Sequence, residues 1–250
     1  MDEKYNAICL KRTAFRDDRE MLTLFTLERG IVDCALIGAK KAGSKLRFCG
    51  ETFCFAEYVL AEKSDRRTVK EANEIDCFYG IRSDLDRYYC AAVVDEFLLN
   101  VAYQGEENYQ LFLLSVKTLK AVELGEKPRL ALVWFLINAL NAVGYLIDFS
   151  ACHDCGGEIK DRAFFDFYDS RALCGSCSSE RATEIKYDTY SLIKAVSEMD
   201  GESLKNVGIS TYSKTFDNDK SILNAIRFFD HYIKMNLSLN LKTIKSVIGS

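Results

Sequence analysis

Two closely spaced Cys-x-x-Cys pairs constrain this chain more than any other feature of its sequence. The stretch "CHDCGGEIKDRAFFDFYDSRALCGSC" carries Cys152, Cys155, Cys174 and Cys177, with eighteen residues between the pairs. Each pair can form a tight turn that points two sulfurs at one place, and two such turns complete a tetrahedron around zinc. The spacer lies within the range usual for paired zinc knuckles. We therefore predict one zinc ion on these four residues, with "AFFDFYDSRAL" forming a small hairpin beside it.

Two other interpretations of the four thiols are unligated cysteines and a pair of redox dithiols. A redox Cys-x-x-Cys usually opens a helix after a strand in a βαβ unit, and the sequence around Cys152 and Cys174 has no such pattern. Zinc is therefore the favoured interpretation. Because four thiolates fill a tetrahedral site, we expect His153 to be exposed rather than a ligand, and the ion to be structural.

The motifs of the common hydrolases and transferases are missing from the sequence. It contains no His-x-Glu with a Pro-Cys-x-x-Cys, no Gly-x-Ser-x-Gly and no phosphate-binding Gly-Lys-Ser/Thr, and it has only two histidines. A catalytic zinc would also need an open ligand position. We therefore predict a protein that is not an enzyme; a zinc hydrolase with three sulfurs and a bound water is the least favoured alternative.

The first eighty residues have the pattern of short strands. The segments are "NAICLK", "MLTLFTLE", "GIVDCALIG", "FCFAEYVLAE" and "RRTVKEANEI". Five short strands in so few residues predict a small closed or half-closed barrel of the OB type. An open antiparallel sheet is the alternative that the alternation alone leaves open.

After Gly80 the apolar residues follow a helical spacing. The helical segments are "IRSDLDRYYCAAVVDEFLLNVAYQG", "NYQLFLLSVKTLKAVELG", the segment that Pro128 opens, and the ranges 184–199 and 220–248. The third segment is apolar on almost every side, which predicts a helix at the centre of a bundle. The predicted fold class is α+β and multidomain. An OB-like barrel at 1–80 precedes an α-helical domain at 81–250, which carries the zinc-binding insertion at about 150–180.

Charge and hydropathy indicate a cytoplasmic protein. The net charge is −4, and the longest apolar run, Leu130 to Ile137, is eight residues, whereas a membrane span needs about twenty. The first twenty residues lack the apolar core of a signal peptide. Thiols stay reduced in the cytoplasm, so we expect the other six cysteines to be small apolar core residues. These are Cys9, Cys34, Cys49, Cys54, Cys77 and Cys90.

Two basic stretches of the N-terminal domain are candidates for binding DNA. The first contains Lys40, Lys41, Lys45 and Arg47. The second contains Lys11, Arg12, Arg16 and Arg19 and is diluted by two aspartates, Asp17 and Asp18. Loops and one face of a small barrel can form a groove that follows a phosphate backbone, with Phe15, Phe48 or Phe53 stacking on bases. The alternative is a solvated loop above core aromatics, which is the commoner outcome for such patterns. The composition of the chain leaves both open.

The C-terminal segment "SILNAIRFFDHYIKMNLSLNLKTIKS" is amphipathic and basic. An apolar stripe of Ile222, Ile226, Phe229 and Ile233 is accompanied by Arg227, Lys234, Lys242 and Lys245. An apolar cleft rimmed by these bases would suit an acidic peptide with an apolar tip. The alternative is that the stripe is packed into the core.

Taken in order, these segments resemble the RecO family of bacterial recombinational repair proteins. The resemblance is carried by "AICL", "LTLFTLERG", "IGAKKAGSKLRFCGETF", "IRSDLDRYYCAAVVDEF", "LFLLSVKTL", "GYLIDFSACHDCGG", "ALCGSC" and "FFDHYIKMNLSLNLKTIKS". These pieces extend over nearly the whole chain. No piece is unique, but their order is specific.

The resemblance implies a function that composition does not reveal. RecO-like proteins bind single- and double-stranded DNA and anneal complementary strands. With RecR, and with RecF in some lineages, they help RecA replace single-strand-binding protein on gapped DNA, and their helical domain binds the acidic C-terminal tail of single-strand-binding protein. By position, Lys40, Lys41, Lys45 and Arg47 would contact DNA, and the protein would be bacterial, cytoplasmic and nucleoid-associated. A zinc-stabilised protein–protein adaptor without DNA affinity is the alternative.

Overall fold

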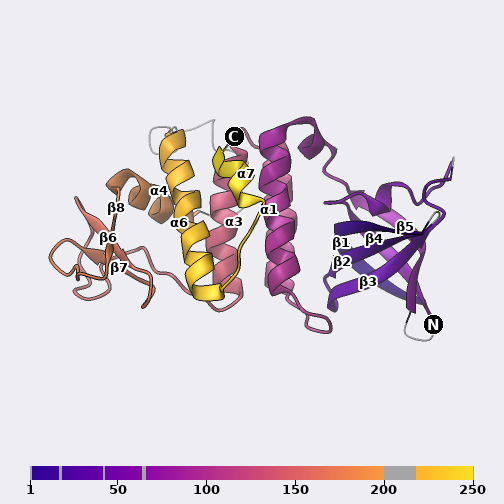
Figure 1. Ribbon diagram of the computed structural model, residues 1–250, viewed down its shortest axis with the longest axis horizontal. Coiled ribbons are helices and arrows are strands. Elements are labelled where there is room, and N and C mark those ends of the chain that lie inside the picture. Colours follow the sequence, from indigo (N-terminus) through magenta and orange to yellow (C-terminus); the bar gives the residue numbers. More distant parts are fainter. Residues whose placement is uncertain (1, 17–18, 42, 64–65, 200–217, 250) are drawn as a thin grey trace.

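The chain forms an elongated molecule with a β-barrel at one end, helices in the middle and a small three-stranded sheet at the other end (Figure 1). The structure is a computed structural model, and it describes residues 2–16, 19–41, 43–63, 66–199 and 218–249. The side chain of Arg16 also lies outside the described part.

The N-terminal end is a closed five-stranded barrel. Its strands are β1 (Asp2–Arg16), β2 (Arg19–Thr26), β3 (Gly30–Ile37), β4 (Phe55–Lys63) and β5 (Arg66–Asp76), in the order β1-β2-β3-β5-β4. All pairs are antiparallel except β3 with β5. Alternate residues such as Val32, Cys34 and Leu36 on β3 point into the core, as the period of a strand requires. The predicted OB-like barrel is confirmed.

The long connection between β3 and β4 packs its apolar residues onto the barrel interior. It contains a short 3-10 helix, η1 (Phe48–Gly50), and it buries Ala39 and Cys49 in the barrel core. The hydroxyl of Tyr58, a buried β4 residue, donates a 2.7 Å hydrogen bond to the carbonyl of Cys49. The connection is therefore fixed from inside, and its basic residues are left on the outer surface.

The helices follow the predicted order. They are η2 (Tyr79–Ser83), α1 (Leu85–Val101), α2 (Tyr109–Leu124), α3 (Pro128–Ala142), α4 (Tyr187–Ser197), α6 (Asp219–Leu237) and α7 (Ile244–Gly249). The side chains of Asp84 and Asn108 cap α1 and α2, and Pro128 is the first residue of α3. All residues from Leu130 to Ile137 are buried, so α3 is the central helix that the sequence predicted.

Two predicted helical ranges are shorter than expected. The range 184–199 begins with the strand β8 (Thr183–Ile185) before α4 starts. The range 220–248 is broken after Leu237, because Ser238 adopts a left-handed conformation with φ of 57°. A break of this kind ends a helix without a change in the apolar pattern, so periodicity could not reveal it.

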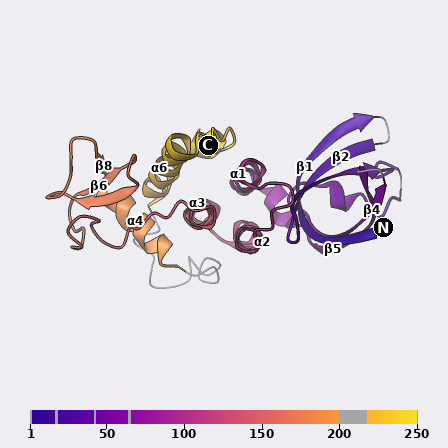
Figure 2. The same ribbon diagram turned by 90° about the horizontal axis from the view of Figure 1, so that it is seen from below.

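The barrel interior forms a core of its own, and a few barrel residues join the hydrophobic core of the helices. Ile8, Phe25, Phe53 and Phe78 belong to the same cluster of buried residues as the helices, and Phe25 and Phe55 both contact the ring of Phe112 on α2. The barrel is therefore packed directly on α1 and α2 (Figure 2).

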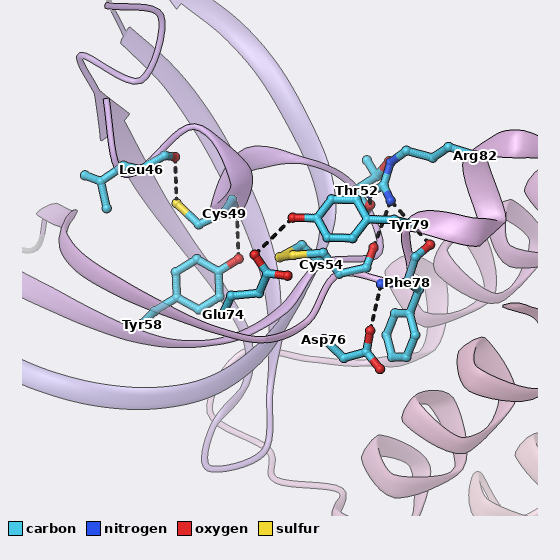
Figure 3. The surroundings of a disulfide bond; sticks show 11 residues. Leu46, Cys49, Thr52, Cys54, Tyr58, Glu74, Asp76, Phe78, Tyr79 and Arg82 are labelled. Carbon is cyan, nitrogen blue, oxygen red and sulfur yellow. Dashed lines mark hydrogen bonds between the residues drawn. A yellow bond between two sulfur atoms is a disulfide. The ribbon is translucent and has the colours of Figure 1, made fainter. Parts of the chain in front are cut away.

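Arg82 in η2 reinforces this junction. Its guanidinium donates to the carbonyls of Thr52, Cys77 and Phe78 (Figure 3). It also lies 5.7 Å from the centre of the Phe53 ring. Two contacts with α2 also hold the junction together. Lys120 forms an ion pair with Asp76 at 2.8 Å, and the backbone N–H of Gly80 donates a 3.0 Å hydrogen bond to Glu123.

A second contact joins the β2–β3 turn to the loop between α1 and α2. The N–H of Ile31 donates to the carbonyl of Tyr103 at 3.1 Å, and the N–H of Gly105 donates to the carbonyl of Arg29 at 3.0 Å. A Cβ on Gly30 would lie 2.2 Å from the carbonyl oxygen of Tyr103, so only glycine fits there.

One expectation about the cysteines is wrong. Cys54 and Cys77, which the sequence assigned to the core as free thiols, form a buried disulfide between the start of β4 and the residue after β5 (Figure 3). They face each other because Phe55 and Asp76 are partners in the β4–β5 ladder. The expectation holds for the other four, which are buried free thiols: Cys9, Cys34, Cys49 and Cys90.

Within the described residues, no helix is both long enough and apolar enough to cross a membrane.

Candidate metal centre and nucleic-acid interface

The four cysteines of the paired knuckles converge on one point. Cys174 ends a strand of a small sheet, which consists of β6 (Ala163–Asp166), β7 (Arg171–Cys174) and β8 in the order β7-β6-β8. The other three cysteines lie in the loops before β6 and after β7. The four sulfur atoms all lie within 4.8 Å of one another, and the sulfurs of Cys155 and Cys174 are 3.9 Å apart. The predicted hairpin is confirmed, and Cys174 is the last residue of its second strand.

The backbone around the first knuckle favours a thiolate. The N–H of Cys174 donates to the sulfur of Cys152 at 3.3 Å. Burial opposes ionisation of Cys152, but backbone N–H groups of Cys155, Cys174 and Asp154 lower the pKa of its thiol to about 6. Hydrogen bonds with the other three sulfurs raise the pKa of Cys177 to about 12. Four sulfurs this close cannot all ionise unless a cation joins them.

The geometry of the cluster fits a tetrahedral metal ion. With Zn–S bonds of about 2.3 Å, neighbouring sulfurs in a tetrahedron lie roughly 3.8 Å apart. The 3.9 Å between Cys155 and Cys174 is close to that value. Four cysteines therefore could hold one metal ion. His153 is exposed, as expected, and its backbone N–H donates to the carbonyl of Ala172.

Aromatic side chains attach the cysteine-bearing sheet to the helices. Phe165 on β6 is fully buried, and its ring lies 5.8 Å from that of Phe149 and 4.8 Å from that of Phe228 on α6. The four-cysteine cluster is therefore connected to the helical core through a group of packed aromatic side chains.

The basic connection between β3 and β4 presents most of its cations to solvent. Lys40, Lys41, Lys45 and Arg47 are all exposed. The charge of Lys40 is partly compensated, because its ammonium lies 3.7 Å from the carboxylate of Glu20.

The second basic group is less uniform. Lys11 is exposed, whereas Arg12 is half-buried and pairs with Glu20 at 2.8 Å and Glu51 at 3.0 Å. These two carboxylates compensate the charge of Arg12, so its attraction for a phosphate is reduced. The side chain of Arg16 lies outside the described residues.

Of the three aromatic residues suggested for stacking on bases, Phe53 is unsuitable. It is 2% exposed and packs against Tyr88 with ring centres 5.5 Å apart, so the expectation is wrong for this residue. It faces the helices because η1 and the following turn direct it to the domain junction. Phe15 is 59% exposed and Phe48 is half-buried.

The C-terminal apolar stripe is part of the core. Ile222, Ile226, Phe229 and Ile233 are each at most 2% exposed, so the stripe forms no open cleft. The four associated bases are spread out. Lys234 pairs with Asp230 on its own helix, Lys242 and Lys245 are exposed at α7, and Arg227 is exposed and lines a cavity.

Two of the cavities on the described helical part of the molecule bear on a binding site. One, of about 480 Å³, lies between α2 and α3 and is lined by Tyr109, Leu113, Lys117 and Trp134 among others. The other, of about 370 Å³, lies between α6, α4 and the cysteine-bearing sheet. Neither could be derived from the sequence, because each is formed by segments that are distant along the chain.

Sequence reasoning also missed a buried acid. Asp95 on α1 is 5% exposed, and neither of its carboxylate oxygens has a hydrogen-bond partner among the described residues. Burial raises its pKa well above the usual value, and only the charge of Arg82 opposes this shift. Asp95 lies on the buried face of α1, directly after the buried Val94. That position was the one signal in the sequence that its carboxyl group would be buried.

An OB-type barrel packed on a helical domain, which itself carries a four-thiol insertion, defines a specific two-part class of protein. Comparison with protein families agrees with this architecture: residues 1–78 match the family described as Recombination protein O N terminal, and residues 82–243 match Recombination protein O C terminal. The chain belongs to the RecO family, as the order of its segments predicted.

Several curated relatives carry the name DNA repair protein RecO. The protein of Desulforamulus reducens is 28% identical over 243 residues, which cover 96% of this chain and 91% of the relative. The protein of Clostridium novyi is 27% identical over 216 residues, which cover 84% of this chain and 83% of the relative. That of Caldicellulosiruptor bescii is 25% identical and covers 96% of both.

Proposed function

We propose that this protein is a non-enzymatic recombination mediator in DNA repair, in which residues 1–80 bind DNA and residues 81–250 form a helical domain stabilised by zinc at about 150–180. The observation that carries the proposal is the match to both RecO domains, together with an exposed basic connection on the barrel. Small barrels with basic loops bind single-stranded nucleic acid in many proteins.

The metal is one structural Zn²⁺ held by Cys152, Cys155, Cys174 and Cys177. The support for this assignment is the sulfur spacing and the absence of any non-sulfur ligand from the cluster within the described residues. Four thiolates select zinc over harder divalent ions and leave it no open position for chemistry. Elemental analysis of purified protein should find one zinc per chain, and substitution of Cys155 by serine should lower that ratio.

The DNA contact is made by Lys40, Lys41, Lys45 and Arg47, with Lys11, Arg12 and Arg16 as flanking bases. Binding to single- and double-stranded DNA should weaken steeply with salt, because each neutralised phosphate releases counterions. Reversal of the four central charges to glutamate should lower affinity for every sequence alike.

A charge-conserving variant is the matched control for that experiment. Lys40→Arg, Lys41→Arg, Lys45→Arg and Arg47→Lys together keep four cations on the same exposed loop. This variant should bind DNA as the wild-type protein does. Normal binding by the glutamate variant would show that the contact surface lies elsewhere.

The partners we propose are RecR, the acidic C-terminal tail of single-strand-binding protein, RecA and, in lineages that use it, RecF. Together they would load RecA onto gapped DNA, in the nucleoid of a bacterial cytoplasm. Arg227, Lys234, Lys242 and Lys245 are the candidate bases for the acidic tail, supported by the net charge of +4 over residues 220–250. Charge reversal at these positions should weaken binding of an acidic tail peptide in fluorescence anisotropy.

The second candidate is a zinc-stabilised adaptor without DNA affinity. The near neutrality of the barrel domain favours it, because its fourteen basic residues are matched by fourteen acidic ones. A gel-shift titration at low and moderate salt separates the two candidates. Binding of single-stranded DNA supports the mediator, whereas peptide capture without any DNA shift supports the adaptor.

A further inference from the structure

The cavity beside the cysteine-bearing sheet is built by three separate parts of the chain. Phe167 follows β6, Lys186 lies between β8 and α4, and Arg227 and His231 lie on the outer side of α6. Its volume is about 370 Å³, which is within the range of sites for small molecules or single side groups.

Aromatic rings form one wall of this cavity. The ring of Phe167 lies 4.6 Å from the ring of His231 in an edge-to-face arrangement and 5.0 Å from the ring of Phe228. Phe228 is only 7% exposed, and its other neighbours Phe149 and Phe165 fix it in the core. The wall is therefore rigid, and it presents aromatic surface to the cavity.

The floor of the cavity contains a polar group that the protein does not satisfy. Thr189 is 2% exposed, and its hydroxyl has no hydrogen-bond partner among the described residues. Thr189 lies in the first turn of α4 and lines the cavity. A buried hydroxyl without a partner is costly, so a ligand that reaches it would be favoured. The amide of Asn224 supplies a second polar group in the same lining.

The rim of the cavity is cationic. Arg227 is exposed, and its guanidinium donates a 3.1 Å hydrogen bond to the side-chain oxygen of Asn224, its one hydrogen-bond partner among the described residues. Lys186, which also lines the cavity, is exposed too. The one acid in the lining, Glu184, is already paired with Arg162 at 2.9 Å. The rim therefore attracts an anion.

We propose that this cavity binds one nucleotide of single-stranded DNA, with the base against the aromatic wall and its phosphate at Arg227 and Lys186. The proposal rests on the proposed DNA-binding function and adds a second contact to it. Aromatic surface, a hydrogen-bonding floor and a cationic rim are the three elements that proteins combine to hold a base and its phosphate. β8 and α4, which line the cavity, lie at the opposite end of the molecule from the barrel (Figure 1).

Three single variants test the cavity in the full-length, metal-loaded protein with oligo(dT) as the probe. Replacement of His231 by alanine removes an exposed ring and should lower affinity roughly tenfold, the effect expected for loss of one stacked base. Replacement of Arg227 by glutamine should reduce the slope of log affinity against log salt by about 1. Thr189→Val keeps the shape of the side chain and should weaken binding several-fold without lowering stability.

The matched control is Lys160→Gln, which removes one positive charge from an exposed residue of the same insertion that does not line the cavity. Oligonucleotides containing 5-iodouracil supply an independent measurement. Their photo-crosslinks should map to peptides containing Phe167 or His231.

The proposal is overturned if all three variants bind oligo(dT) as the control does, or if crosslinks appear only in the barrel. It is also overturned if the variants lose only binding of an acidic peptide, because the cavity would then serve a protein partner. These results differ from a failure of the proposed function, in which the wild-type protein itself would show no salt-sensitive binding to DNA.

Discussion

At the scale of single residues, the buried carboxyl of Asp95 is a source of pH-dependent stability. Its pKa is raised in the folded protein, so the unfolded state loses its proton at a lower pH than the folded state does. The stability that the raised pKa of Asp95 contributes is therefore fully present below the unfolded pKa of about 3.9. It is lost as the pH rises toward and through the folded pKa. Arg82 opposes the shift, and the Cys9 thiol is the other titratable group coupled to Asp95.

Replacement of Asp95 by asparagine should remove this pH dependence. We expect the variant to be more stable than the wild-type protein at pH 8, by about 1–3 kcal/mol, because it no longer buries a group that ionises in the unfolded state. Urea unfolding between pH 5 and pH 8 measures the difference. Parallel stability curves for the two proteins would contradict the role assigned to Asp95.

A second residue-scale prediction concerns Gly30. Its φ of 63° and the 2.2 Å approach of the Tyr103 carbonyl both exclude a side chain. Replacement by alanine should therefore destabilise the protein by about 1–3 kcal/mol and should loosen the contact between the barrel and the α1–α2 loop. Gly43→Ala is a useful comparison. Gly43 also has positive φ but no atom near the added Cβ, so the difference between the variants isolates the contact.

These residues show which parts of a site the sequence can predict. The four cysteines were predicted because their spacing is local and their chemistry is restrictive. Asp95, Thr189 and the Cys54–Cys77 disulfide were not, because each depends on which distant segment lies opposite. Phe53 was assigned to the wrong role for the same reason: its exposure is decided by Tyr88 and Arg82, on the helical side of the junction.

At the scale of elements, the cysteine-bearing sheet should depend on the zinc ion that we propose. Its strands have four, four and three residues, too few to be stable without additional support. Chelation should therefore unfold residues of the insertion, including the wall of the cavity that Phe167 contributes, while the barrel stays folded. Hydrogen exchange with and without chelator measures this, and equal protection in the sheet under both conditions would contradict it.

Acidification should have the same effect as chelation. The pKa of Cys152 lies at about 6, lowered from its ordinary value, so the thiolate is present above that pH and is lost below it. We expect metal to be retained at pH 7.5 and released progressively on acidification, because protons compete with the ion for sulfur. A zinc-sensitive dye reports the release directly.

The Cys54–Cys77 disulfide is a second feature that should stabilise individual elements, here β4 and β5. It closes a loop of 23 residues across the end of the β4–β5 hairpin, beside the Arg82 junction. Its loss should cost about 3 kcal/mol in the chain-entropy account. Urea unfolding of the wild-type protein should therefore shift with reductant, whereas a Cys54→Ala, Cys77→Ala double variant should not respond. Insensitivity of the wild-type protein to reductant would contradict the prediction.

The secondary structure was predictable where patterns are local and uninterrupted. The five strands and the central helix α3 were anticipated from alternation and from continuous apolar character. The break between α6 and α7 was not, because a single left-handed residue, Ser238, leaves the apolar period unchanged. The closure of the barrel and its packing on α1 also required the structure, since strand pairing is a long-range property.

At the scale of the whole molecule, the barrel lies at the opposite end from β8 and α4, which line the cavity (Figure 1). A few apolar residues of the barrel are packed into the core of the helices. Since that core fixes the barrel on the helices, the two proposed DNA contacts are held at a constant separation. A strand long enough to reach both would gain affinity from the second contact without a second loss of translational freedom.

Affinity should therefore rise in a step as oligo(dT) is lengthened. Short oligomers occupy one contact at a time, and the step marks the length that spans both. In the His231→Ala variant the step should disappear, while the affinity of the barrel for short oligomers is kept. In the four-glutamate barrel variant the affinity for short oligomers and the size of the step should both fall. Fluorescence anisotropy across a length series measures this, and a smooth rise that is identical in wild-type and variant protein would show that the two ends do not share one strand.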